Sequence, residues 1–130
     1  MSAADVERLV AAATKAREFT HQLAPGKTVT VRLPTEHQLE LATAAMQGGE
    51  TGVLEYFRGL LEQCIVDWSG VVEADLVPGE PDEPAPAVPF NRALVPLLLD
   101  AKPAQAKELR AELIARLSQR AARAKAAQKN

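Results

Sequence analysis

Apolar residues recur at helical spacing through most of the chain, which predicts a structure built mainly from helices. The first helix should span residues 3–22, with a helix-start pattern at Ser2 and Asp5 and a stop at Ala24-Pro25-Gly26. We expect it to bury one apolar face. The positions on that face are Val6, Leu9, Val10, Ala13 and Ala16.

The strongest helical pattern in the sequence lies between residues 54 and 68. Its apolar residues keep to one face over four turns, so we predict one helix at the centre of the core. Burying each of them would contribute about 1.5–3 kcal/mol. Ser69-Gly70 should end this helix. The predicted core residues are Leu54, Phe57, Leu61, Cys64, Ile65 and Trp68.

Three further helix starts are marked by capping residues and prolines. Thr35 and Gln38 form a capping box after Pro34. A short helix should begin near Val95, which puts Pro96 at a favoured early position. A long helix should run from Pro103 into the 120s and fray beyond about Arg120. The apolar stripe of that last helix is Leu109, Leu113 and Leu117.

Residues 28–33 show the only alternation typical of a strand. Val29, Val31 and Leu33 alternate with polar residues, and the segment is rich in β-branched side chains. No second strand is evident from the sequence. The segment is therefore an edge strand, half of a small hairpin, extended chain, or a strand that pairs with a partner.

Together these patterns predict a mainly α fold, a small helical domain of about four to five helices with one short extended segment near residues 28–33. The distribution of charge divides the chain further. Residues 1–101 carry 7 basic and 15 acidic side chains, whereas residues 102–130 carry 8 basic and 2 acidic ones. We therefore expect an acidic helical domain over 1–101, with an exposed proline-rich loop at 77–89, and a basic C-terminal helix over 102–130.

Residues able to carry catalysis or bind a metal are scarce and scattered. His21 and His37 lack further ligands at helical spacing, so we interpret both as surface residues and expect no metal site. Cys64 lies on an apolar face, which favours a buried hydrophobe over a reactive thiolate. Trp68 is interpreted as a core residue in preference to an interface anchor. We expect no enzyme, no cofactor and no membrane span, since the cluster around Leu94–Leu99 is far shorter than the roughly 18 residues required.

Two segments resemble the small tail assembly chaperones of long-tailed bacteriophages and prophages. The first is Leu60-Leu61-Glu62-Gln63-Cys64-Ile65-Val66-Asp67-Trp68-Ser69-Gly70-Val71, which is followed by an acidic insert. The second is Val88-Pro89-Phe90-Asn91-Arg92-Ala93-Leu94 with Leu98-Leu99-Asp100. The resemblance covers roughly residues 50–103. The insert here is longer and richer in proline than the family pattern, and Pro96 interrupts the helix after Phe90.

The resemblance implies a non-enzymatic protein of the host cytoplasm that is absent from the mature virion. Such chaperones bind the tape measure protein, keep its apolar helices soluble, and help to recruit tail tube subunits. A protein that does this needs an exposed apolar surface. One candidate is the edge formed by Val29, Val31 and Leu33. The other is the face of the last helix, and its residues are Leu109, Leu113, Leu117, Arg116 and Arg120.

Two other functions remain open on the sequence. One is another phage structural or connector component, such as a head–tail joining protein. The other is a small nucleic-acid-binding regulator that uses the basic C-terminal helix, although the helix has no aromatic residues among its basic ones. Self-association is also plausible, because an acidic body and a basic tail attract each other.

Overall fold

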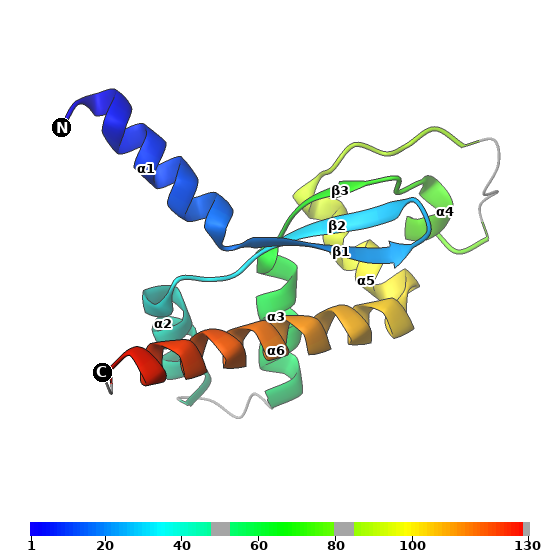
Figure 1. The fold of residues 1–130 in the computed structure, drawn as a ribbon. Helices are drawn as coiled ribbons and strands as arrows, with labels where there is room; N and C mark the ends of the chain where they lie inside the picture. Colours follow the sequence, from blue (N-terminus) through cyan, green and yellow to red (C-terminus); the bar gives the residue numbers. More distant parts are fainter. Residues whose placement is uncertain (48–52, 80–84, 129–130) are drawn as a thin grey trace.

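Helices dominate the computed structural model, as the sequence predicts, but they are built around a small antiparallel sheet (Figure 1). The structure describes residues 1–47, 53–79 and 85–128. Its elements in chain order are α1 (Ala3–Ala16), β1 (Glu18–Ala24), β2 (Lys27–Arg32), α2 (Glu36–Gln47), α3 (Val53–Cys64), β3 (Ile65–Ser69), α4 (Glu73–Leu76), the 3₁₀ turn η1 (Arg92–Leu94), α5 (Val95–Ala101) and α6 (Pro103–Gln128).

The segment near residues 28–33 is β2, the central strand of a sheet whose order is β1-β2-β3. Of the alternatives left open by the sequence, half of a hairpin is correct, because β2 pairs with β1, and an edge strand is wrong. The prediction of one helix over residues 3–22 is wrong, because α1 ends at Ala16 and β1 follows. β1 pairs antiparallel with β2, with Phe19 opposite Val31 and His21 opposite Val29. Pairing satisfies the backbone groups of β2, which outweighs the helical tendency of these residues.

The helix predicted over residues 54–68 also ends early, at Cys64, and Ile65–Ser69 form β3 on the other side of β2. Both Ile65 and Trp68 are buried although they lie three residues apart. A bulge explains this, because the register shifts between Thr30 and Val31 and leaves Val66 without a direct partner. The two buried residues are therefore three apart in sequence, as they would be on one face of a helix, although they lie in a bulged strand.

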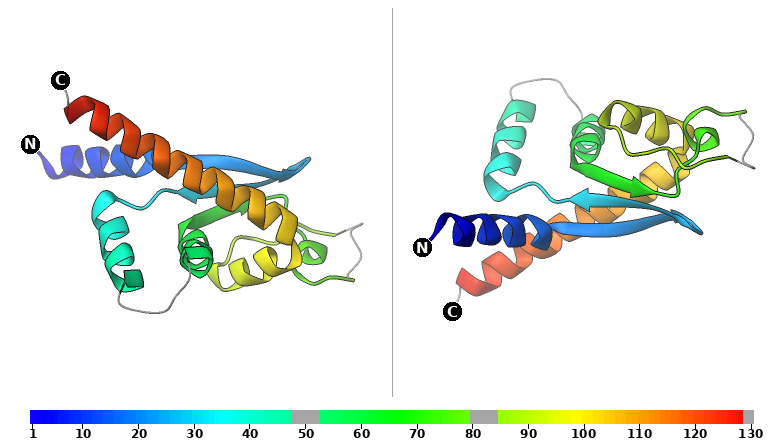
Figure 2. Two further views of the ribbon diagram at one scale, coloured as in Figure 1. Left: turned by 90° about the horizontal axis from the view of Figure 1, so that it is seen from below. Right: turned by 90° about the horizontal axis from the view of Figure 1, so that it is seen from above.

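The core lies between the inner face of the sheet and helices α3, α5 and α6. Figure 2 shows α6 crossing beneath the sheet and extending past it. Leu61, Cys64, Ile65 and Trp68 are buried, which confirms their predicted place in the core, and Phe57 is partly buried. The side chain of Leu54 lies outside the described residues. The core residues are Phe19, Val29, Val31, Leu60, Leu61, Cys64, Ile65, Trp68, Val71, Leu76, Val95, Leu98, Leu109 and Leu113.

Trp68 has the structural role expected from the sequence. Its indole Nε1 donates a hydrogen bond to the Val88 carbonyl at 2.8 Å, and its ring meets that of Phe90 edge to face with centroids 5.1 Å apart. Val88 N–H in turn donates to the Val71 carbonyl at 2.7 Å. These contacts hold the end of the 77–89 loop against the sheet. Residues 80–84 of that loop lie outside the described residues.

The helix starts predicted from capping residues are confirmed. Thr35 Oγ1 accepts a hydrogen bond from Gln38 N–H at 3.1 Å, and Gln38 Oε1 accepts one from Thr35 N–H at 2.9 Å. Ser2 and Asp5 form the same reciprocal pair at the start of α1. Asn91 Oδ1 accepts from the amide two residues on, which starts η1. Helices α5 and α6 begin at Val95 and Pro103, as predicted.

A buried carboxylate joins the β1–β2 turn, α4 and the start of α6. Asp75 is 2% exposed, and both of its oxygens lie 2.8 Å from Lys27 Nζ. Lys102 Nζ lies 3.2 Å away, and Val72 N–H donates to the same carboxylate at 2.9 Å. Neither α4 nor this ion cluster was predicted from the sequence, because the three charged residues are far apart along the chain.

Helix α1 stands apart from the sheet and the other helices (Figures 1 and 2). It has no buried residue, so the expectation that its apolar face would be buried is wrong. Val6, Leu9 and Val10 are 48%, 45% and 61% exposed. α1 is joined to β1 through Arg17, and its apolar face lies outside the core that the rest of the chain forms.

Candidate functional site

An apolar groove lies where α2, α3 and α6 meet, with a volume of about 340 Å³. Ile114 and Leu117 form its α6 wall, and Tyr56 and Phe57 form the opposite wall on α3. The two aromatic rings lie edge to face with centroids 5.0 Å apart. The apolar groove is lined by Leu39, Thr43, Tyr56, Phe57, Ile114, Leu117, Ser118 and Ala121.

The predicted binding stripe on α6 is divided between this groove and the core. Leu109 and Leu113 are fully buried, which corrects their assignment to a partner surface. Val29 and Val31, on the alternative surface, are fully buried as well. Only Leu117 of the three predicted leucines reaches the groove, where it is partly buried. A helix places residues three and four apart on one face, but the stripe rotates slowly around it, so α6 turns from the core to the groove along its length.

Ile114, which lines the groove and is 36% exposed, was not among the residues predicted from the sequence. It directly follows Leu113, so it lies off the narrow stripe of leucines spaced four apart. A wider stripe that included Ile114 and Ala121 would have indicated a second apolar face on α6. Phe57 was predicted as an apolar helix position, but the sequence does not show that it and Leu39 meet α6 at the groove.

Arg116 was predicted as part of a basic rim, but its contacts lie within the chain. Its guanidinium carbon stands 4.1 Å from the centroid of the Phe19 ring, and its Nη2 lies 3.1 Å from Glu112 Oε2. The other oxygen of Glu112 is hydrogen-bonded to His21 Nδ1. His21 is therefore not the surface residue that was expected, since its side chain lies partly buried between β1 and α6.

This network sets the ionisation of Glu112. Burial raises the pKa of its carboxyl, but hydrogen bonds from His21 and Arg116 and the charge of Arg116 outweigh burial, and the net pKa lies below its usual value. Glu112 therefore remains charged at neutral pH and joins α6 to β1.

Arg120 also makes contacts within the chain that hold α6 in place. Its Nη1 donates to the Pro34 carbonyl at 2.6 Å, and its Nε lies 2.8 Å from Glu36 Oε1. These contacts fix α6 against the start of α2 and so set one side of the apolar groove. The basic side chains beyond it, Arg123 and Lys125, are exposed.

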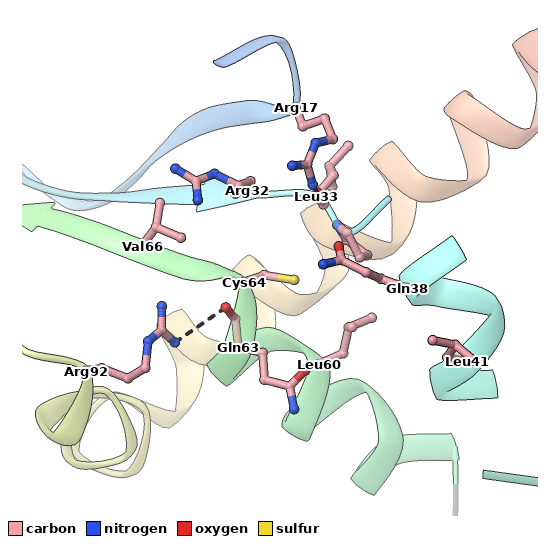
Figure 3. A pocket seen from close by; sticks show the side chains of 11 residues that line it. Arg17, Arg32, Leu33, Gln38, Leu41, Leu60, Gln63, Cys64, Val66 and Arg92 are labelled. Atoms are coloured by element: carbon pink, nitrogen blue, oxygen red, sulfur yellow. Dashed lines mark hydrogen bonds between the residues drawn. The ribbon is translucent and has the colours of Figure 1, made fainter. Parts of the chain in front are cut away.

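A second hollow, the arginine-lined pocket, lies on the other side of α2 and has a volume of about 460 Å³. Figure 3 shows the Cys64 thiol directed into it between the strand end and α2. Burial raises the pKa of this thiol to about 11, although nearby arginines oppose the rise, so it is protonated at neutral pH. The lining residues are Arg17, Arg32, Leu33, Pro34, Gln38, Leu41, Leu60, Gln63, Cys64, Val66 and Arg92.

The arginines of this pocket are held by other groups of the chain. Arg92 donates to the backbone carbonyls of Glu62 and Gln63 at the end of α3, at 3.1 and 3.4 Å, and to that of Ile65 at the start of β3, at 2.8 Å, and so caps that helix. Figure 3 shows the contact between Arg92 and Gln63. Arg32 is paired with Glu18 through contacts of 2.6 and 3.0 Å. The pocket is therefore built mainly by structural contacts, and the apolar groove is the better candidate for binding another molecule.

Within residues 1–47, 53–79 and 85–128, no group of three or more His, Cys, Asp or Glu side chains is placed to hold a metal ion. None of the helices described there has the length and apolar character needed to cross a membrane. Comparisons with protein-family models, curated proteins and solved structures find no match to this chain.

Proposed function

We propose that this chain is a tail assembly chaperone that holds an apolar helix of a phage tape measure protein in the apolar groove and helps to recruit tail tube subunits. The resemblance of residues 50–103 to that family supports the proposal. The observation that carries it is the groove itself, an open apolar surface between three helices. Amphipathic helices bind grooves of this kind through side chains at positions i, i+3, i+4 and i+7.

The composition of the groove favours an apolar helix over other ligands. Leu39, Phe57, Ile114 and Leu117 offer branched and aromatic surface, and the polar groups near them are the hydroxyls of Thr43, Tyr56 and Ser118. The Thr43 hydroxyl donates to the Leu39 carbonyl at 2.8 Å and lies 3.4 Å from the Tyr56 hydroxyl, from which it can accept. A charged ligand would lose its hydration here without gaining a charged partner.

Co-expression with a phage tape measure protein tests the proposal. The wild-type chain should raise the soluble yield of that protein. Ile114→Glu should abolish the gain, because it puts a carboxylate in the groove while altering a side chain that is not part of the buried core. Ala115→Glu is the matched control, since Ala115 is an exposed residue of the same helix and does not line the groove.

A wild-type chain that leaves the soluble yield unchanged would contradict the proposal, and so would equal activity of the two variants. Purified particles provide a second readout. A chaperone is absent from them, whereas a connector component is present at a fixed ratio to the tail proteins.

A further inference from the structure

Helix α1 has an exposed apolar face, and none of its residues is buried. It has 14 residues, and isolated helices of that length are marginal in water. Val6, Leu9 and Val10 lie at positions i, i+3 and i+4 and form one stripe. A stripe of this kind gains stability only when another apolar surface covers it.

The connection between α1 and the sheet keeps this face away from the core of its own chain. Arg17 alone separates α1 from β1. Its carbonyl accepts a hydrogen bond from Leu33 N–H at 2.8 Å, and its Nη1 donates to the Leu33 carbonyl at 2.7 Å. Because the junction is fixed to the end of β2, α1 points away from the sheet, and nothing within residues 1–47, 53–79 and 85–128 buries its stripe.

The apolar groove of the same chain has the matching properties. The Val6–Leu9–Val10 stripe extends about 6 Å along α1, and the groove follows α6 over about 10 Å between residues 114 and 121, so the stripe fits within it. The charges of α1 and α6 favour one orientation of α1 in the groove. Near its start α1 carries Asp5 and Glu7 against one basic residue, Arg8, and near its end it carries Lys15, whereas the end of α6 beyond the groove carries the exposed Arg123 and Lys125. An α1 helix in the groove is favoured with its acidic start toward the basic end of α6.

We infer that two copies of this chain exchange their α1 helices, each placing the Val6–Leu9–Val10 stripe in the apolar groove of the other copy. Reciprocal exchange uses both unsatisfied surfaces of each chain and closes after two copies. The inference rests on the proposed function, because it treats the same groove as a helix-binding surface. α1 then competes with the client helix, and the free chaperone keeps its own groove covered until a client displaces it.

Light scattering coupled to size-exclusion chromatography tests the exchange with two disruptive variants and their controls. Val10→Glu alters the stripe, and Ile114→Glu alters the groove. Each should raise the dimer dissociation constant by about 100-fold or more, since each puts a charge into the apolar contact. Ala11→Glu and Ala115→Glu add the same charge at exposed positions beside these sites and should leave the dimer intact. Circular dichroism verifies that all four variants fold.

Charge reversal tests the orientation. Glu7→Lys and Arg123→Glu should each weaken the dimer, and the chain carrying both should recover most of the loss, because the reversed pair again attracts. The absence of recovery would overturn the stated direction of α1.

A monomeric wild-type chain, an open series of larger oligomers, or a dimer insensitive to Val10→Glu and Ile114→Glu would each overturn the exchange. The co-expression assay separates this failure from failure of the proposed function. Val10→Glu leaves the groove unchanged and should still raise the client's soluble yield. A monomeric wild-type chain that solubilises the client refutes only the exchange, whereas a sensitive dimer without effect on the client refutes only the chaperone role.

Discussion

Replacement of Asp75 by asparagine should strongly destabilise the fold. The amide would keep the shape of the side chain but remove the buried negative charge that contacts Lys27 and Lys102. Removing one partner of a fully buried ion pair costs about 3–5 kcal/mol. The two lysine side chains here are 25% and 37% exposed and regain part of their hydration. We therefore expect a loss of about 2 kcal/mol in the free energy of unfolding.

Urea unfolding followed by circular dichroism measures this loss, and Asp67→Asn is the matched control. Asp67 is exposed, and the substitution removes the same charge without breaking a buried contact. The control should change the free energy of unfolding by less than about 0.5 kcal/mol. Thermal unfolding should show a melting temperature roughly 8 °C lower for Asp75→Asn. Equal stability of the two variants would refute the structural role of the buried carboxylate.

The wild-type protein and Asp75→Asn should also differ in their response to pH. Burial raises the pKa of Asp75, but hydrogen bonds from Lys27, Val72 N–H and Lys102 outweigh burial and lower it overall. A lowered pKa in the folded state stabilises the protein above the unfolded value of about 3.9. That contribution disappears as the pH falls through the lower, folded-state value. The difference in the free energy of unfolding between wild type and Asp75→Asn should therefore be largest at neutral pH and decrease in acid. A difference that does not change with pH would contradict the assigned pKa shift.

Four other predictions concern the turn at Gly70, the interior of helix α3, the cap of that helix and the Cys64 thiol. Gly70 has φ +79°, and a Cβ there would lie 2.0 Å from the Gly26 carbonyl oxygen, so Gly70→Ala should cost at least about 2 kcal/mol in urea unfolding. Gly59→Ala, in helix α3 with open space around it, should instead stabilise by about 0.5–1 kcal/mol. Arg92→Gln should cost about 1–2 kcal/mol and speed amide exchange at the end of α3, since the carbonyl contacts are lost. Cys64 should react with a thiol reagent in the native protein far more slowly than in urea, because with a pKa of about 11 only about one thiol in ten thousand is ionised at pH 7.

Local signals allowed the helix starts to be predicted because they act within four residues. The Thr35–Gln38 box and the prolines at 96 and 103 determine backbone geometry wherever the helix later packs. Strands β1 and β3 were missed for the opposite reason, whereas β2 was indicated by its own alternation. Phe19 is in β1 because β2 pairs with it, and the residues of β1 taken alone also suit a helix.

The candidate site depends even more on tertiary structure. The leucines of α6 were correctly identified as an apolar stripe, but the sequence does not state which of them faces the sheet. Leu113 meets the core and Ile114 meets α2 and α3, although the two are neighbours. Likewise, the repeat of Val6, Leu9 and Val10 shows that α1 is amphipathic, but only the fixed junction at Arg17 shows that its face is left uncovered.

The order of the sheet has a consequence for how the chain folds during synthesis. The β1–β2 hairpin joins neighbouring residues and can form as soon as it leaves the ribosome. Its pairing with β3 brings Val31 to Ile65 across two intervening helices, which is a slower, non-local step. The core is completed only by Leu109 and Leu113, near the end of the chain. A nascent chain stalled before α6 would therefore expose its unfinished apolar core to water, and it should be a ready substrate for aggregation and proteolysis.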